Sequence, residues 1–229
     1  MCKVKIFLIL FLVSSPSLFS QSIYVGLGTG INIIEGDNYY TSNFGRFGVY
    51  QSVNGTVTNF AGMGLSNEMQ FQVNGKYSFN NSPFSFVVGL QYLRMTGKES
   101  VPIYSETFKM PIYQNVTTEM DIWNFNLGAN YSFNINRFKP FINATLLSNY
   151  FDDVFIRIGN DENYSQFLSY KNGMRYGFSI GTGLGYDVFQ NIELELLTSY
   201  NSFNVLNKRS GESLLNSIGV LLNVYYKVY

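Results

Sequence analysis

Histidine is absent from all 229 positions of this chain, and the single cysteine is Cys2. Because histidine is the usual general base near neutral pH, its absence argues against enzymes that rely on a Ser-His or His-Asp constellation. Charged residues make up only 13% of the chain, about half the usual share. No clustered basic face can be read from the sequence, so nothing indicates a nucleic-acid partner.

Long hydrophobic runs are missing beyond the first twenty residues, whereas a membrane-spanning helix needs about 20 apolar residues. The first twenty residues contain Lys3 and Lys5, an apolar stretch over 6–13 and small residues over 14–20. This order predicts a cleaved export signal over residues 1–20 and a mature domain over 21–229. Cys2 lies inside the expected signal, so we expect no disulfide and no cysteine metal site in the mature chain.

Apolar and polar residues alternate over segments of unusual length. Between residues 68 and 79 the odd positions hold Met, Phe, Val, Gly, Tyr and Phe, and the even positions hold Glu, Gln, Gln, Asn, Lys and Ser. A period of two places the two sets on opposite faces of a β-strand. Strands of soluble proteins usually have about five or six residues, whereas a strand that crosses a bilayer needs roughly 9–11. The pattern therefore favours membrane-spanning strands.

Eight such segments follow one another, and aromatic residues form 17% of the chain, as expected for membrane-interface girdles. The expected strands cover residues 23–34, 68–79, 84–92, 123–134, 142–150, 174–187, 192–200 and 218–228. The fifth has the least regular alternation, because Phe141 and Leu147 interrupt it.

The connections between these segments alternate in length. Those after the second, fourth and sixth strands have about four to seven residues, and the others cover 35–65, 97–118, 151–170 and 201–213. Short periplasmic turns and long external loops are typical of outer-membrane barrels. The sequence therefore predicts an all-β fold, an eight-stranded antiparallel up-and-down transmembrane β-barrel with four long external loops. Asn54-Gly55 signals a hairpin inside the first loop; a ten-stranded barrel is the alternative, but the arm over 56–60 is too short to cross.

Several short motifs resemble the small outer-membrane β-barrel family of the OmpA and OmpX type, particularly barrels from Bacteroidetes-like bacteria. The matching segments are Ser20-Gln21, Tyr24-Val25-Gly26-Leu27-Gly28, Asn130-Tyr131-Ser132-Phe133, Phe138-Lys139-Pro140-Phe141 and the terminal Tyr225-Tyr226-Lys227-Val228-Tyr229. The resemblance implies a location in the bacterial outer membrane. It also implies that the barrel insertion machinery reads the C-terminal strand.

A few charged residues fall on the presumed inner face. Glu193 and Glu195 lie two residues apart, about 7 Å along their strand. One interpretation is a carboxylate-based hydrolase. The favoured one is a structural lumen network with Lys227 as the partner of Glu193, and with Lys76 and Arg175 in other polar contacts, because buried charges need partners and a narrow barrel has little room for a substrate.

Neither the glycine-rich segments nor the acidic loop indicates a cofactor. The series Gly26-x-Gly28-x-Gly30 and Gly181-x-Gly183-x-Gly185 have a period of two, unlike a dinucleotide fingerprint, and small residues on one face make room for larger ones opposite. Asp152, Asp153, Asn160, Asp161 and Glu162 do not have the spacing of an EF-hand loop. We therefore expect no catalytic, cofactor or metal site.

The resulting prediction is a monomeric, non-enzymatic barrel with a structural or surface-interaction role, in contact with outer-membrane lipid. An extracellular partner, if there is one, is not identified by the sequence. The loop aromatics that are candidates for contacting it are Tyr39, Tyr40, Tyr104, Tyr113, Phe151 and Tyr164. The alternative function is a pore or transport accessory. The alternative fold is a soluble secreted sandwich, with the aromatic side chains in its core.

Overall fold

The computed structural model describes residues 21–36, 50–52, 55–57, 64–79, 82–105, 110–133, 135–158, 172–208 and 212–229. The expected export signal lies outside the described residues, as do Tyr39, Tyr40, Tyr164 and residues 160–162. Within the described part of the chain, no helix has the length and apolar character to cross a membrane.

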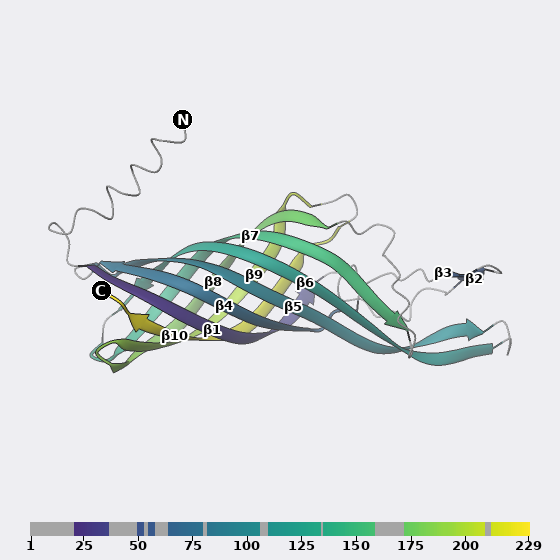
Figure 1. Ribbon diagram of the computed structural model, residues 1–229, viewed down its shortest axis with the longest axis horizontal. Helices are drawn as coiled ribbons and strands as arrows, with labels where there is room; N and C mark the ends of the chain where they lie inside the picture. The colour runs from purple at the N-terminus through teal and green to yellow at the C-terminus, as the bar shows by residue number, and fades with distance from the viewer. Residues whose placement is uncertain are drawn as a thin grey trace, which may run out of the picture.

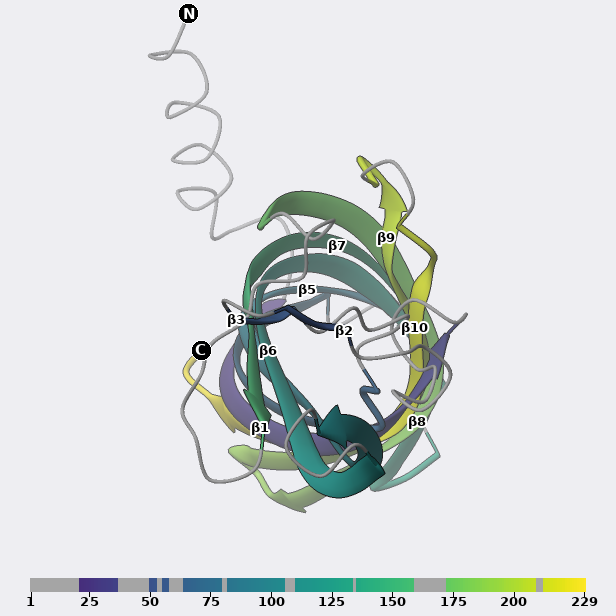
Figure 2. The same cartoon turned by 90° about the vertical axis from the view of Figure 1, so that its right-hand side faces the viewer.

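Eight long strands form a closed barrel, as predicted (Figures 1 and 2). They are β1 (Gln21–Gly36), β4 (Asn67–Phe79), β5 (Phe84–Ser105), β6 (Met110–Ser132), β7 (Phe138–Ile158), β8 (Gly173–Phe189), β9 (Ile192–Leu206) and β10 (Leu215–Lys227). Neighbours pair antiparallel, and β1 closes the ring between β4 and β10. The strands β2 (Tyr50–Ser52) and β3 (Gly55–Val57) form a separate two-stranded sheet. The hairpin interpretation of the first loop is therefore confirmed, and ten strands are excluded.

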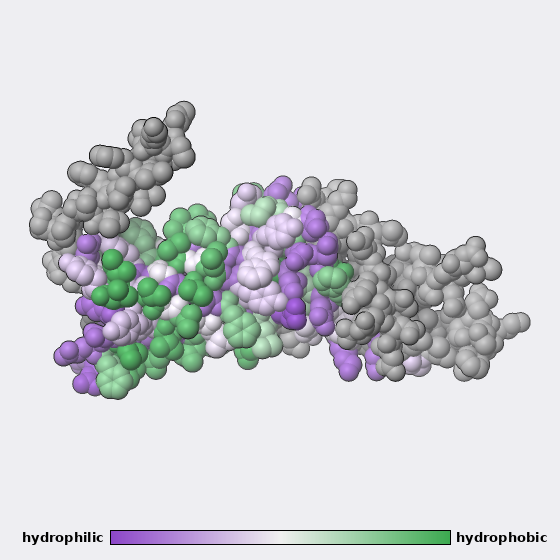
Figure 3. Space-filling view, viewed as in Figure 1, coloured by the Kyte–Doolittle hydropathy of each residue, from purple (hydrophilic) through white to green (hydrophobic). Residues whose placement is uncertain are grey.

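The two faces of the wall are the reverse of those in a soluble sheet. Leu27, Leu90 and Leu146 point outward with 65%, 64% and 67% of their surface exposed. Asn74 and Asn223 point inward and are buried. Figure 3 shows a band of apolar side chains on one face of the described barrel wall. An apolar belt around a polar interior is a lipid-facing surface, so the soluble sandwich is wrong.

Aromatic side chains contact one another at both ends of this belt. Near the short turns, the ring of Tyr131 lies 5.0 Å from that of Phe84 and 5.1 Å from that of Phe133, both edge-on. Toward the long connections, the Tyr92 and Trp123 rings lie 4.9 Å apart. Such girdles mark the two membrane interfaces. We call the end with the short turns and the C-terminus the turn end, and the other the loop end.

Several strands continue well beyond the expected boundaries at the loop end. β5 and β6 have 22 and 23 residues, so most of the expected loop 97–118 is a β-hairpin. β9 reaches Leu206, and the expected loop 201–213 is correspondingly shorter. Where β5 and β6 leave the bilayer the alternation inverts, with apolar residues inside and polar ones outside. Antiparallel pairing continues because backbone hydrogen bonds need no apolar outer face. The predicted faces are confirmed, whereas these loop boundaries are wrong.

Candidate functional site in the barrel lumen

The lumen is filled by side chains that interlock between neighbouring strands. Gly26 on β1 is paired with Tyr225 on β10, and a Cβ atom on Gly26 would lie 2.7 Å from the Tyr225 Cε1 atom. A Cβ atom on Gly28 would likewise lie 2.8 Å from Cγ of Gln72 on β4. The prediction that inward glycines make room for larger side chains is therefore confirmed at these positions.

Five charged side chains lie together near the turn end. Lys76 of β4 forms ion pairs with Glu193 and Glu195 of β9, and its Nζ lies 2.7 Å from Oε1 of Glu195. Lys139 of β7 places its Nζ 2.9 Å from Oε2 of Glu193 and 2.7 Å from Oδ1 of Asp187 on β8. Lys76, Glu193 and Glu195 are almost fully buried, so each of these charges depends on its neighbours. We call this group the charged layer.

The structure brings together only some of the charged residues that the sequence singled out. Lys76, Glu193 and Glu195 meet, but Lys227 forms no ion pair with Glu193 among the described residues. The correction has a simple cause: Tyr225 is the residue of β10 that pairs with Glu193, and Lys227 lies two residues farther toward the turn end. Sequence reasoning missed Lys139, whose strand entry was obscured by the Pro140-Phe141 interruption.

Arg175 lies in a separate cluster near the loop end. It is fully buried, and its Nε donates hydrogen bonds of 3.1 and 3.2 Å to the two carboxylate oxygens of Glu212. Asn204 of β9 also donates a 2.9 Å hydrogen bond to Glu212 Oε1. The Arg175 guanidinium carbon stands 5.0 Å from the centre of the Phe151 ring. Glu212 belongs to the connection between β9 and β10, where strand periodicity gives no signal.

An apolar cluster fills the lumen around this ion pair and was not predicted. Its members come from several strands and from the segments beside them: Ile34, Leu65, Leu93, Met95, Met120, Ile122, Leu147, Phe151, Val154, Phe203 and Leu215. Phe151 has no exposed surface, so its assignment as a partner-contacting loop aromatic was wrong. By contrast, Tyr113 is 75% exposed. We call the cluster the apolar layer.

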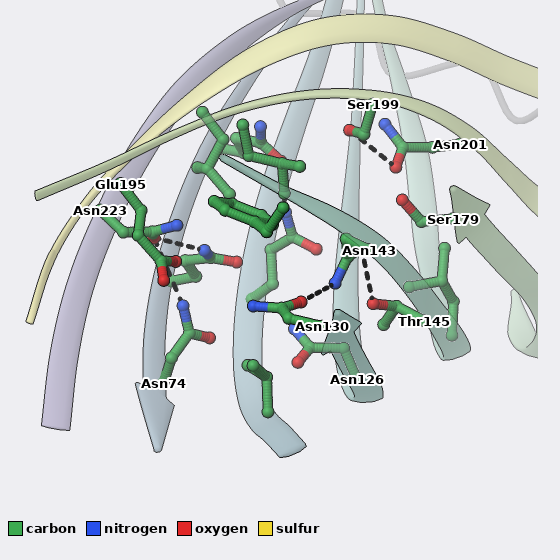
Figure 4. A pocket seen from close by; sticks show the side chains of 18 of the residues that line it. Asn74, Asn126, Asn130, Asn143, Thr145, Ser179, Glu195, Ser199, Asn201 and Asn223 are labelled. Atoms are coloured by element: carbon green, nitrogen blue, oxygen red, sulfur yellow. Dashed lines mark hydrogen bonds between the residues drawn. The ribbon is translucent and has the colours of Figure 1, made fainter. Parts of the chain in front are cut away.

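Amide side chains occupy the middle of the lumen around a cavity of about 60 Å³ (Figure 4). Asn143 donates a 2.7 Å hydrogen bond to Asn130, and Thr145 donates one of 3.0 Å to Asn143. Gln72 donates a 2.6 Å hydrogen bond to Asn223. The cavity has room for a few water molecules, but it is well below the roughly 300–1,000 Å³ of small-molecule sites.

A larger cavity of about 330 Å³ lies at the turn end and reaches Lys76, Lys139 and Glu193. The charged layer therefore separates this cavity from the small central one. The part of the chain that the structure describes contains no cluster of three potential metal ligands. In the acidic segment that the sequence analysis considered, the backbone amide of Asp153 donates a hydrogen bond to the side chain of Asp152, and the side chain of Asn172 donates one to the side chain of Asp153.

Comparison with known proteins gives matches in structure alone. No protein-family model matches the sequence, and neither does any curated protein. Neisserial surface protein A (NspA) is 16% identical, with a TM-score of 0.51 over 91% of this chain and 99% of that one. Ail of Yersinia pestis, solved with the heparin analogue sucrose octasulfate, is 12% identical (TM-score 0.39; 90% and 99% covered). Outer membrane protein W of E. coli is 14% identical (TM-score 0.35; 92% and 99% covered).

At this identity the likeness to NspA concerns the fold, and the apolar belt adds an independent physical argument. A closed barrel pairs all strand backbone groups internally, which is the condition for crossing a bilayer with β-strands. The described lumen is lined by polar and apolar side chains, while the outer wall faces lipid. The chain therefore has the fold of the small outer-membrane β-barrels, and this fold with its apolar belt indicates the bacterial outer membrane as its location.

Proposed function

We propose that this protein is a non-conducting anchor in the outer membrane that presents a β-sheet extension to the outside of the cell. The observation that carries the proposal is the double closure of the lumen, by the charged layer at the turn end and by the apolar layer at the loop end. An eight-stranded barrel is just wide enough for side chains to fill it. If either layer were lost, the other would still close the lumen.

The surface that we assign to interaction is the part of β5, β6 and β7 beyond the outer girdle. β4 pairs with β5 only up to the Asn67–Thr96 pair, but β5 and β6 stay paired as far as Ser105 and Met110. β7 continues beside β6 up to the Ile158–Val116 pair. These strands are longer than membrane crossing requires, which supports a role for the extension outside the bilayer.

An enzymatic role has little support in this geometry. Glu193 and Glu195 form the carboxylate pair that a hydrolase would use, but Lys76 binds both of them. The central cavity beside Glu195 is too small for a lipid or peptide substrate, and the larger turn-end cavity is lined by Glu193 but not by Glu195. We therefore assign the pair to the structure of the barrel. As further parts of the proposal, the protein is a monomer surrounded by lipid, and its β10 strand is read by the insertion machinery.

A pore or transport accessory remains the second candidate, because the turn-end cavity opens the lumen as far as the charged layer. Conductance in planar bilayers separates the two candidates. We expect no discrete current steps from folded protein, whose insertion is verified by its heat-modifiable gel mobility. Regular single-channel steps that scale with the amount of inserted protein would refute the non-conducting anchor.

The surface role is tested by shortening the extension. Gly97 pairs with Thr118, so residues 98–117 can be replaced by an Asn-Gly turn without changing the register below. The shortened barrel should fold and insert like the full chain. In a strain that lacks the protein, it should fail to restore surface phenotypes such as adhesion. Full restoration by the shortened barrel would show that the extension has no surface role.

A further inference from the structure

An apolar groove of about 500 Å³ lies on the outer wall, where β6, β7, β8 and β9 run side by side. Phe125 and Leu127 of β6 form one side, and Phe178 of β8 with Leu206 of β9 forms the other. Its volume falls within the roughly 300–1,000 Å³ of small-molecule sites, in contrast to the central cavity. Neither the barrel fold nor the proposed surface role requires such a groove.

One cause of the groove is a small residue in a row of large ones. Ser148 of β7 is paired with Phe125 on one side and with Tyr176 on the other. All three residues line the groove. A serine between two aromatic residues leaves a gap between their side chains.

The second cause is a bulge between β8 and β9. From the Tyr176–Leu206 pair to the Phe178–Ser202 pair, β8 advances by two residues and β9 by four. Gly177 lies opposite the bulge, and a Cβ atom there would overlap the carbonyl oxygen of Ser202. Glycine thus permits a close approach of the two backbones and contributes no side chain to fill the wall.

The floor of the groove consists of residues from the inward-facing set. Leu147 lines both the outer groove and the central cavity, so this one side chain lies between the bilayer and the lumen. Ser148 contributes the only side-chain hydroxyl besides that of Tyr176. A lining of this kind matches a hydrocarbon chain and offers few partners to a charged headgroup.

The position of the groove identifies the source of its occupant. Phe125 lies two residues from Trp123 of the outer girdle, so the groove lies just inside the outer girdle. It is continuous with the exposed belt around it, which includes Leu146 and Leu127. Water is scarce at this depth, so the groove is filled from the bilayer.

We propose that this groove binds one hydrocarbon chain of an outer-membrane lipid and retains it after the rest of the annular lipid has been removed. The hydrocarbon chain would lie across β7 between the side chains of β6 and those of β8, filling the gap left by Ser148. The proposal depends on the lipid-facing belt and is independent of the surface role of the extension.

Native mass spectrometry of detergent-purified protein tests this directly. The protein is refolded with one phosphatidylethanolamine, exchanged into lipid-free detergent, and examined for a one-to-one adduct. Ser148→Phe fills the groove, and Thr198→Phe is the matched control, because Thr198 is also a small polar residue that points outward but lies away from the groove. We expect an adduct with the original protein and with Thr198→Phe, and about tenfold less of it with Ser148→Phe. Equal retention by all three proteins, or none by the original, would overturn the proposal.

A fluorescence measurement keeps the test decisive if Ser148→Phe does not fold. Trp123 is the chain's single tryptophan and lies two residues from Phe125, which lines the groove. When the protein is refolded with a brominated-chain phospholipid and then exchanged into detergent, Trp123 should stay quenched. The control is Trp123→Phe/Leu222→Trp, which moves the reporter to an outward position on β10. Loss of quenching at both positions would mean that no lipid chain is retained, and it would overturn the proposal.

Discussion

The two ends of the lumen are closed by different chemistry. At the turn end, Lys76 of β4 binds two carboxylates of β9, a strand that does not pair with β4. At the loop end, packed apolar side chains lie around the ion pair between Arg175 and Glu212. A buried ion network fails when one member is removed, because its partners are left charged without compensation. An apolar layer loses stability in proportion to the volume removed. The difference predicts an abrupt response at one end and a graded one at the other.

The largest effect is expected for Lys76→Met. The substitution leaves Glu195 buried without a cation, whereas Glu193 keeps Lys139 at 2.9 Å. Removing one partner of a buried pair costs about 3–5 kcal/mol. Urea unfolding in detergent, followed by Trp123 fluorescence, should therefore show a much lower midpoint.

A second substitution distinguishes loss of charge balance from loss of packing. In Lys76→Met/Glu195→Gln the uncompensated carboxylate is gone, and Glu193 still has its partner Lys139. The double variant should regain most of the lost stability, since removing both partners of an ion pair is often nearly neutral. An unchanged midpoint for Lys76→Met alone would contradict the role that we assign to the charged layer.

Phe151→Ala is expected to have the next largest effect. The ring is fully buried in the apolar layer and lies under the Arg175 guanidinium. Truncating a buried phenylalanine costs about 3–5 kcal/mol, and we expect the lower part of this range because the lumen can admit water. Phe151→Leu keeps most of the volume and should cost less than about 1.5 kcal/mol. The same unfolding assay measures both; two equal losses would show that volume does not determine stability here.

The comparison of the two ends also explains what could be predicted from the sequence. The charged layer was partly visible, because Lys76, Glu193 and Glu195 all lie on strands whose alternation is regular. The apolar layer was hidden, because the alternation inverts in upper β5: inward Leu93 and Met95 are apolar, whereas outward Arg94 and Thr96 are polar. Leu147 appeared to be an irregularity of the fifth strand, but it is a lumen side chain.

Residues outside regular strands account for the rest. Glu212 lies on a connection, so no spacing rule could pair it with Arg175, 37 residues away. The bulge opposite Gly177 shifts the pairing register of β9 against β8, and the amino-acid composition of the two strands gives no sign of that shift. The outer groove depends on that shift and on Ser148. It is therefore a property of three-dimensional pairing that strand periodicity does not encode.

The smallest effect is expected for an ion pair on the outer wall, which sharpens the contrast with the charged layer. Arg94 and Asp121 face each other across β5 and β6, with Nη2 of Arg94 2.8 Å from Oδ2 of Asp121. The Arg94 side chain is 48% exposed, so solvent screens the pair. Exposed pairs contribute about 0–1 kcal/mol, and Arg94→Gln should lower the unfolding midpoint only slightly. In the unsubstituted protein, the contribution of this ion pair to stability should shrink in high salt, because exposed charges are screened. A loss as large as that of Lys76→Met would mean that burial does not separate these two ion pairs, and the contrast between the lumen and the wall would fail.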